Sequence, residues 1–93
     1  MKDEKILTLH PDGKMGVNIL KRRYDVMKDF IIKTLKEHQA LSFEELTVMA
    51  VDTLTNTFDG KVKWYVVTVK LDLEARGLIE RIPKTSPQML RLK

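Results

Sequence analysis

The chain has 93 residues, of which 43% are hydrophobic and 32% charged, and this composition predicts one globular domain over residues 1–93. It contains no cysteine, which excludes disulfides, thiolate metal sites and cysteine nucleophiles. The net charge of +4 is divided into +3 for residues 1–38, −4 for residues 39–60 and +5 for residues 61–93, a modest basic excess that permits binding to a polyanion without requiring it.

The N-terminal residues predict a strand and a turn. Residues 5–9 (KILTL) are β-prone, and the following segment His10-Pro11-Asp12-Gly13 favours a type I turn. An isolated hairpin is only marginally stable, so a third strand would help a chain this short. We therefore expect residues 5–9 to be structural, either beside the C-terminal hairpin or across the third helix.

A long helix is predicted from about Ile19 to His38, with Asn18 placed to cap it. Ile19 and Leu20 also suit an extended approach to this helix. Its inward face consists of apolar residues three and four apart, namely Leu20, Tyr24, Met27, Phe30, Ile31 and Leu35.

The second helix is predicted over residues 43–55, because Ser42 and Glu45 have the spacing of a capping box. The segment 56–60 then forms a turn, in which Asp59 is placed to cap the third helix. The residues of the second helix that we expect to point inward are Leu46, Met49, Ala50, Thr53 and Leu54.

The third helix is predicted over residues 61–76, and Gly77 suits the left-handed position that ends many helices. A hairpin follows, with strands at residues 78–82 and 88–93 joined by the loop 83–87.

This order of elements, together with the phrase Leu73-Glu74-Ala75-Arg76-Gly77-Leu78-Ile79-Glu80-Arg81, resembles the winged helix-turn-helix superfamily. In that superfamily a glycine ends the third helix, a Leu-Ile pair anchors the first wing strand in the core, and a basic loop joins the wing strands. Residues 9–19 (LHPDGKMGVNI) further resemble a small bacterial family of stand-alone winged-helix proteins with no assigned function. The resemblance covers nearly the whole chain and implies an α+β winged helix, with an N-terminal strand, a three-helix bundle and a C-terminal two-stranded β wing. It leaves the role open, because winged helices bind DNA, RNA or proteins and some only dimerise.

The resemblance implies that the third helix enters the DNA major groove. A helical wheel turns Val62, Tyr65, Val66, Val69 and Leu73 inward, so the outward stripe is Trp64, Val67, Leu71 and Ala75. An apolar stripe does not suit base edges, which offer mainly hydrogen-bonding groups, and is typical of a surface covered by protein. We predict a dimer interface at Trp64, Val67 and Leu71, with the N-terminal arm of the same chain as the alternative cover.

Cationic and hydroxyl side chains around the third helix and the wing form the predicted nucleic-acid surface. The loop Lys84-Thr85-Ser86 offers a charge and two hydroxyls to phosphates, although a solvated hairpin with protective edge charges explains it equally well. Glu44, Glu45 and Asp52 on the second helix would repel a phosphate backbone. The predicted contacts are Lys61, Lys63, Thr68, Lys70, Arg81, Lys84 and Arg91.

Catalytic and metal-binding patterns are not recognisable, so we expect a non-enzymatic protein without a cofactor or a metal. A metal site needs three or four ligands, and His10 with Asp12 supplies two. Ser42 is used as a cap, and Ser86 lies in the wing loop without a plausible histidine partner. No apolar run approaches the length of a membrane span and the first residues lack a signal-peptide pattern, so we expect a cytoplasmic location.

Two functions from different classes remain. The leading expectation is DNA binding, for example in transcriptional control, based on the superfamily resemblance and the basic wing. The alternative is a winged-helix module for homodimerisation or protein interaction without nucleic-acid binding, based on the apolar stripe. We expect a homodimer, weak binding of double-stranded DNA at most, and no membrane association.

Overall fold

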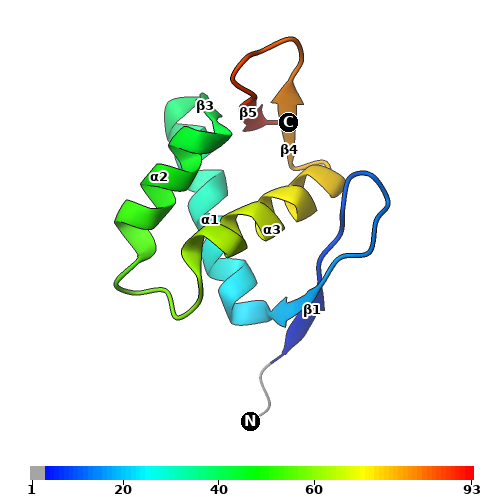
Figure 1. Cartoon of the computed structure of the whole chain (residues 1–93), viewed down its shortest axis with the longest axis vertical. Coiled ribbons are helices and arrows are strands. Elements are labelled where there is room, and N and C mark those ends of the chain that lie inside the picture. Colours follow the sequence, from blue (N-terminus) through cyan, green and yellow to red (C-terminus); the bar gives the residue numbers. More distant parts are fainter. Residues whose placement is uncertain (1–3) are drawn as a thin grey trace.

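The computed structural model describes residues 4–93 and confirms the predicted α+β class. Figure 1 shows an N-terminal hairpin, a group of helices and a wing-like C-terminal hairpin. The elements are β1 (Lys5–Leu7), β2 (Asn18–Leu20), α1 (Lys21–His38), β3 (Ala40–Ser42), α2 (Phe43–Leu54), α3 (Val62–Ala75), β4 (Ile79–Ile82) and β5 (Met89–Leu92). None of the described helices is long and apolar enough to cross a lipid bilayer.

The C-terminal hairpin belongs to a three-stranded antiparallel sheet with the order β3-β5-β4. Leu90 in the central strand lies opposite Leu41 of β3 on one side and opposite Arg81 of β4 on the other. Of the two positions expected for the N-terminal segment, the one beside the hairpin is therefore wrong, whereas the backbone of Leu9 does reach Asp72 on the third helix. Gln39 ends α1 with a left-handed backbone (φ 66°), and the chain then extends along the edge of β5 before α2 begins.

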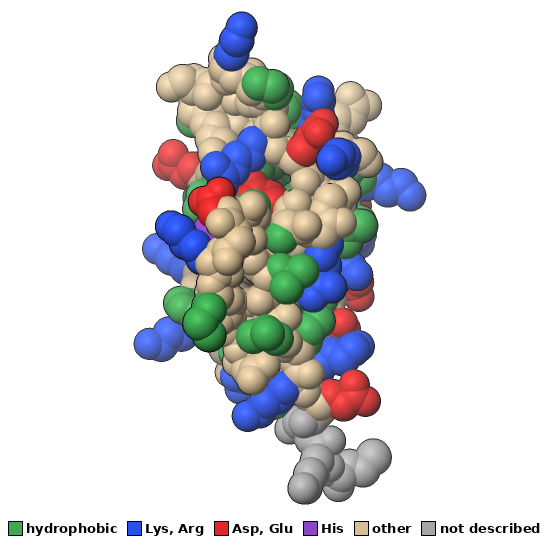
Figure 2. Space-filling model, turned by 90° about the vertical axis from the view of Figure 1, so that its right-hand side faces the viewer, with side chains coloured by type: hydrophobic (Ala, Val, Ile, Leu, Met, Phe, Trp, Pro, Cys, Tyr) green, Lys and Arg blue, Asp and Glu red, His purple; other side chains and the backbone are tan. Residues whose placement is uncertain are grey.

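The N-terminal strand pairs instead with the residues just before α1. Lys5 lies opposite Leu20 and Leu7 opposite Asn18, so β1 and β2 form a separate two-stranded sheet. Figure 2 views the molecule from the side on which the loop of this hairpin lies, and hydrophobic side chains are separated there by lysine and arginine. The predicted strand is confirmed for residues 5–7, but its pairing partner β2 was not predicted.

The loop of the N-terminal hairpin is closed by specific hydrogen bonds. The predicted turn is confirmed, since the Gly13 N–H donates to the His10 carbonyl at 3.0 Å and Gly13 has a φ of 76°. Thr8 is buried, and its hydroxyl accepts from the Val17 N–H at 3.0 Å. A Cβ on Gly16 would lie 1.7 Å from the Thr8 carbonyl oxygen, so this close approach requires glycine.

Helix α1 begins two residues later than predicted. Asn18 lies in β2 and does not cap the helix, whose N-cap is Leu20 without a side-chain hydrogen bond. The Lys21 N–H donates to the Glu4 carbonyl at 2.8 Å. The N-terminal segment thus satisfies a backbone N–H that has no partner within the helix. The inward face is confirmed for Tyr24, Met27, Ile31 and Leu35, which are buried.

Helix α2 begins at the predicted capping box. The Ser42 hydroxyl accepts from the Glu45 N–H at 3.0 Å, and the Glu45 carboxylate accepts from the Ser42 N–H at 3.0 Å. The bond from the Ser42 backbone N–H favours the charged carboxylate, the nearby Ser42 hydroxyl adds to this, and together they lower the pKa of Glu45. Of the residues predicted to point inward, Leu46, Ala50 and Leu54 are buried and Met49 is half-buried, whereas Thr53 is exposed.

The start of α3 lacks the predicted cap. Its N-cap is Lys61, which makes no side-chain hydrogen bond. The Asp59 carboxylate instead accepts from Arg22 and Arg23 of α1, at 2.6 and 3.0 Å. These bonds lower the pKa of Asp59 to about 2, and they tie the loop before α3 to the first turn of α1.

The end of α3 is confirmed at Gly77, which has a φ of 75°. The Leu78 N–H donates to the Leu73 carbonyl at 2.9 Å and the Gly77 N–H to the Glu74 carbonyl at 3.1 Å, the two bonds of a Schellman motif. Only one of the two residues expected to anchor the wing does so, since Ile79 is 1% exposed and Leu78 is 38% exposed.

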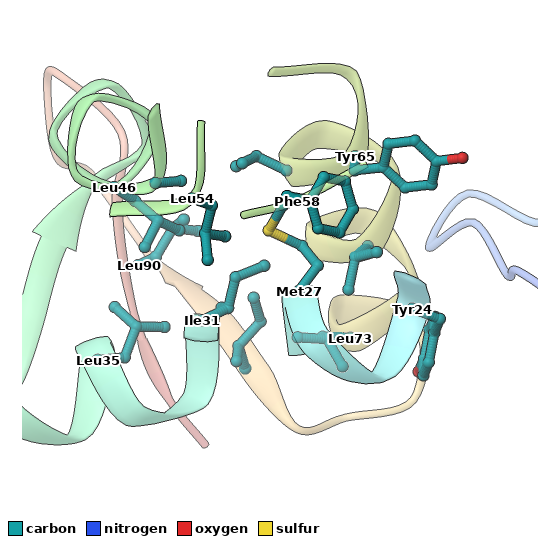
Figure 3. Packing of buried hydrophobic residues seen from close by; sticks show 14 of the residues in the cluster. Tyr24, Met27, Ile31, Leu35, Leu46, Leu54, Phe58, Tyr65, Leu73 and Leu90 are labelled. Carbon is teal, nitrogen blue, oxygen red and sulfur yellow. The ribbon is translucent and has the colours of Figure 1, made fainter. Parts of the chain in front are cut away.

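The hydrophobic core lies where the helices meet the sheet. Figure 3 shows Met27 and Ile31 of α1, Leu46 of α2, Leu73 of α3 and Leu90 of β5 in this cluster. All five side chains are fully buried. Burial of each stabilises the fold by about 1.5–3 kcal/mol. Ile19 of β2 belongs to the same cluster and Ile6 of β1 packs against it, so the core also reaches the N-terminal sheet.

Deleting residues 1–10 should lower the free energy of unfolding by about 2 kcal/mol. The deletion removes the half-buried Ile6, the buried Thr8 and the strand that pairs with β2. Chemical denaturation of the truncated and full chains measures the difference. Identical melting temperatures, or fast amide exchange throughout residues 5–9, would contradict a structural role.

Candidate interaction surface on helix α3 and the wing

The outward stripe of α3 is exposed at its N-terminal end. The predicted inward residues Tyr65, Val66, Val69 and Leu73 are buried, and Val62 is half-buried, which confirms the rotation of the helix. Trp64 is 45% exposed and Val67 41%, whereas Leu71 and Ala75 are half-buried.

The N-terminal arm does not cover this end of the stripe. The Leu9 N–H donates to the Asp72 carboxylate at 2.8 Å, so the arm crosses α3 near its C-terminal half. Trp64 and Val67 lie two and one turns earlier in the helix and keep their exposure. Cover by the same chain is therefore excluded for these two residues within the described structure.

Trp64 packs against a row of other aromatic rings. Its ring packs edge to face on Tyr65, with the ring centroids 4.8 Å apart, and Tyr65 packs in the same way on Phe58 at 5.1 Å. The Arg23 guanidinium lies 5.8 Å from the Tyr65 ring centroid and donates to the Tyr65 hydroxyl at 3.0 Å. These contacts fix the orientation of the Trp64 ring and leave its outer face exposed. An aromatic side chain that is ordered before binding suits the centre of a protein interface.

A shallow groove runs between α2 and the first turn of α3. Two adjoining depressions form it and share Val51 and Lys63. Val48, 55% exposed, lies on the α2 side, and Trp64 closes the groove on the α3 side. The lining also includes Phe43, Glu44, Thr47 and Asp52 of α2, and Thr55, Gly60, Lys61 and Val62 nearer α3.

Lys70, a predicted nucleic-acid contact, is buried. Its ammonium lies 3.2 Å from the Glu74 carboxylate, 3.4 Å from the Gln88 amide oxygen and 5.2 Å from the Phe43 ring centroid. Burial lowers the pKa of Lys70, and Glu74 opposes this effect. The side chain therefore links α3 to α2 and the wing and does not face a ligand.

The two wing arginines are bound by carboxylates. Arg81 makes a two-pronged contact with Glu74, at 2.8 and 3.2 Å, and Arg91 lies 2.7 Å from Glu80. Glu74 is largely buried, with 7% of its side chain exposed, and it serves both Lys70 and Arg81. The cationic charge that the wing offers to solvent is smaller than its sequence predicts.

The remaining predicted contacts are Lys61, Lys63, Thr68 and Lys84. Lys61 and Lys63 are exposed near the start of α3, Thr68 is half-buried, and Lys84 is exposed in the wing loop with a φ of 61°. The neighbouring Thr85 hydroxyl donates to the Ile82 carbonyl and accepts from the Met89 N–H, so it shapes the loop. The three exposed lysines form no ion pair with another described residue.

His10 and Asp12, the pair considered above as possible metal ligands, interact with each other in the N-terminal turn. The His10 Nδ1 accepts from the Asp12 N–H at 3.1 Å, which places both residues in the turn. The described part of the chain contains no group of three or more His, Cys, Asp or Glu side chains that could hold a metal ion.

Sequence reasoning missed the Asp72 carboxylate, which is fully buried. It accepts from the Tyr24 hydroxyl, from the Arg76 Nε at 2.8 Å and from the Leu9 N–H. Burial is the largest cause of the raised pKa of Tyr24, and the bond to Asp72 is the next, so this phenol remains a donor. The available signal was an acid next to the buried position Leu73, with an arginine one turn later.

Comparison with known proteins identifies one family. The model of a Family of unknown function (DUF6958) matches residues 5–90, nearly the whole chain. No curated protein and no solved structure matches.

Replacing Glu74 with Gln should lower the free energy of unfolding at pH 7 by about 2–3 kcal/mol, because it leaves the buried Lys70 ammonium without its carboxylate. Burial already lowers the pKa of Lys70, and losing Glu74 lowers it further. At pH values between this lowered pKa and 10.5, the unfolded chain binds more protons than the folded chain. The free energy of unfolding of the variant should therefore rise, and part of the lost stability return, as the pH rises towards 10.

Urea denaturation at several pH values measures this dependence. Glu80→Gln is the matched control, since Arg91 is exposed and the Glu80 side chain is 34% exposed, so that their pair should contribute less than about 1 kcal/mol. Equal losses in the two variants, independent of pH, would contradict the role given to Glu74.

Proposed function

We propose that this chain, which belongs to the DUF6958 family, is a non-enzymatic winged-helix protein that uses α3 for self-association and not for reading DNA bases. The observation that carries this proposal is the exposure of Trp64 and Val67 at the start of α3. A valine has no hydrogen-bonding group and an indole has a single N–H donor, so they supply few of the hydrogen bonds that distinguish base pairs, whereas aromatic anchors are typical of protein interfaces.

Winged-helix membership is supported by the order of the elements and by the wing. Gly77 ends α3, Ile79 anchors β4 in the core, and the loop carrying Lys84 joins β4 to β5. The distribution of charge supports self-association over groove binding. Lys70, Arg81 and Arg91 are engaged by carboxylates, and Glu44 and Asp52 lie on the helix beside α3.

A second copy of the chain is the favoured occupant of this surface because the groove carries both signs of charge. Glu44 and Asp52 line it from α2, and Lys61 and Lys63 line it from the start of α3. A surface with both signs can complement itself, as a two-fold contact requires.

Weak DNA binding through the wing is the second candidate. Lys84 supports it, because this side chain is exposed at the loop between β4 and β5 and has no carboxylate partner among the described residues. A single point charge contacts phosphates without reading sequence. This activity is compatible with the dimer, since Figure 1 places the wing loop at the end of the molecule away from the start of α3.

Replacing Trp64 with Glu should convert a dimer into a folded monomer. Loss of an aromatic anchor together with burial of a carboxylate should cost at least about 2 kcal/mol of association free energy. Sedimentation equilibrium measures the mass, and circular dichroism confirms the fold. Val26→Glu is the matched control, because Val26 is also 45% exposed but lies on α1, and this variant should remain dimeric. A wild-type monomer at high micromolar concentration, or a dimeric Trp64→Glu variant, would refute the proposal.

Replacing Lys84 with Ala should weaken any DNA binding equally on two unrelated duplexes and flatten the salt dependence by about one unit. Arg91→Ala should have a smaller effect, since Glu80 already binds that guanidinium. Fluorescence anisotropy at several salt concentrations tests both variants. Nanomolar binding to one operator that is abolished by Thr68→Ala would instead mean that α3 reads bases.

A further inference from the structure

The two walls of the groove between α2 and α3 carry opposite charge. Glu44 and Asp52 stand on the α2 wall, and Lys61 and Lys63 stand near the start of α3. All four are exposed, and none forms an ion pair with another described residue. These charges are available to a partner, unlike those of Arg81 and Lys70.

Apolar side chains line the same groove. Val48 on the α2 side and Trp64 on the α3 side are 55% and 45% exposed, and the half-buried Val51 lines both depressions. The four charged residues share the lining with them. Exposed apolar side chains together with charged ones are the usual composition of a specific protein interface.

In a two-fold dimer the surface meets its own copy, and the direction of the axis decides which walls face one another. An axis across the groove would place α2 on α2 and α3 on α3, so that like charges meet. An axis along the groove places α2 of each copy on α3 of the other, so that opposite charges meet twice. Like charges opposed at an interface are unfavourable, and the second arrangement is therefore preferred.

We infer that two copies dock with the axis along the groove, and that Lys63 of one copy pairs with Asp52 of the other. This arrangement rests on the homodimer proposed above and specifies how that dimer is built. Asp52 and Lys63 line the same depression, one on each wall, so they share one stretch of the groove. Rotation about an axis along the groove keeps the position of each residue along it, and each dimer contains the pair twice.

Charge reversal tests the arrangement. Lys63→Glu places two acidic side chains opposite each other at both contacts, and Asp52→Lys places two basic side chains there. Each variant alone should self-associate about tenfold or more weakly than the wild type, because two attractive pairs become repulsive. Mixing the two variants should restore dimers. One contact of the mixed dimer then joins the two introduced side chains, which have opposite charge, and the other contact is the native pair.

Sedimentation equilibrium measures each self-association, and native mass spectrometry identifies the 1:1 heterodimer, because the two variants differ in mass. Circular dichroism verifies that both variants fold. Lys33→Glu and Asp29→Lys on α1 are the matched controls, with the same changes of net charge at exposed residues outside the groove. Each should dimerise like the wild type, and their mixture should show no preference for heterodimers.

The outcomes separate this arrangement from the dimer itself. A dimeric wild type with variants that weaken alone and recover together supports the arrangement. A dimeric wild type whose variants still dimerise, or whose mixture stays monomeric, overturns the arrangement and leaves the homodimer intact. A monomeric wild type overturns both.

Discussion

The fully buried carboxylate of Asp72 holds three separate parts of the chain together. It receives the backbone N–H of Leu9 from the N-terminal arm, the hydroxyl of Tyr24 from α1 and the guanidinium of Arg76 from the end of α3. A buried carboxylate is costly unless its oxygens are satisfied, so the arm, α1 and α3 must assume their positions together. The hydrophobic core, which includes Ile19 and contacts Ile6, links the helices, the wing and the N-terminal sheet. The Asp72 carboxylate adds a polar contact between the arm and α3.

Carboxylates of the chain also decide which of its cations are available to partners, because a cation that is already paired is less available to bind another group. Glu74 binds Lys70 and Arg81, and Glu80 binds Arg91, so three of the seven predicted nucleic-acid contacts are occupied within the chain. Lys61, Lys63 and Lys84 keep exposed ammonium groups. Lys61 and Lys63 adjoin Trp64, so their positive charge lies beside an exposed apolar side chain, whereas Lys84 lies apart in the wing loop.

Features governed by near neighbours were predictable from the sequence. The capping box of Ser42 and Glu45, the turn ending at Gly13 and the helix end at Gly77 each depend on residues only a few positions apart. The inward face of α3 was predictable because helical periodicity fixes the angle between side chains. Among site residues, the same periodicity identified Trp64 and Val67 as exposed.

Only the tertiary structure decided the partners of charged and extended segments. On a helical wheel Lys70 and Asp72 flank the outward stripe of α3, yet both are buried. Lys70 contacts Glu74, Phe43 and Gln88. Asp72 accepts hydrogen bonds from Tyr24, Arg76 and the arm. Likewise, β1 pairs with β2, and β3, which was not predicted as a strand, completes the wing sheet. The sequence by itself determined the three helices, the C-terminal hairpin and the inward direction of each helix, because those depend on local backbone geometry. The burial of an ion and the pairing of a strand depend on groups brought close from distant positions, and only the folded chain defines those distances.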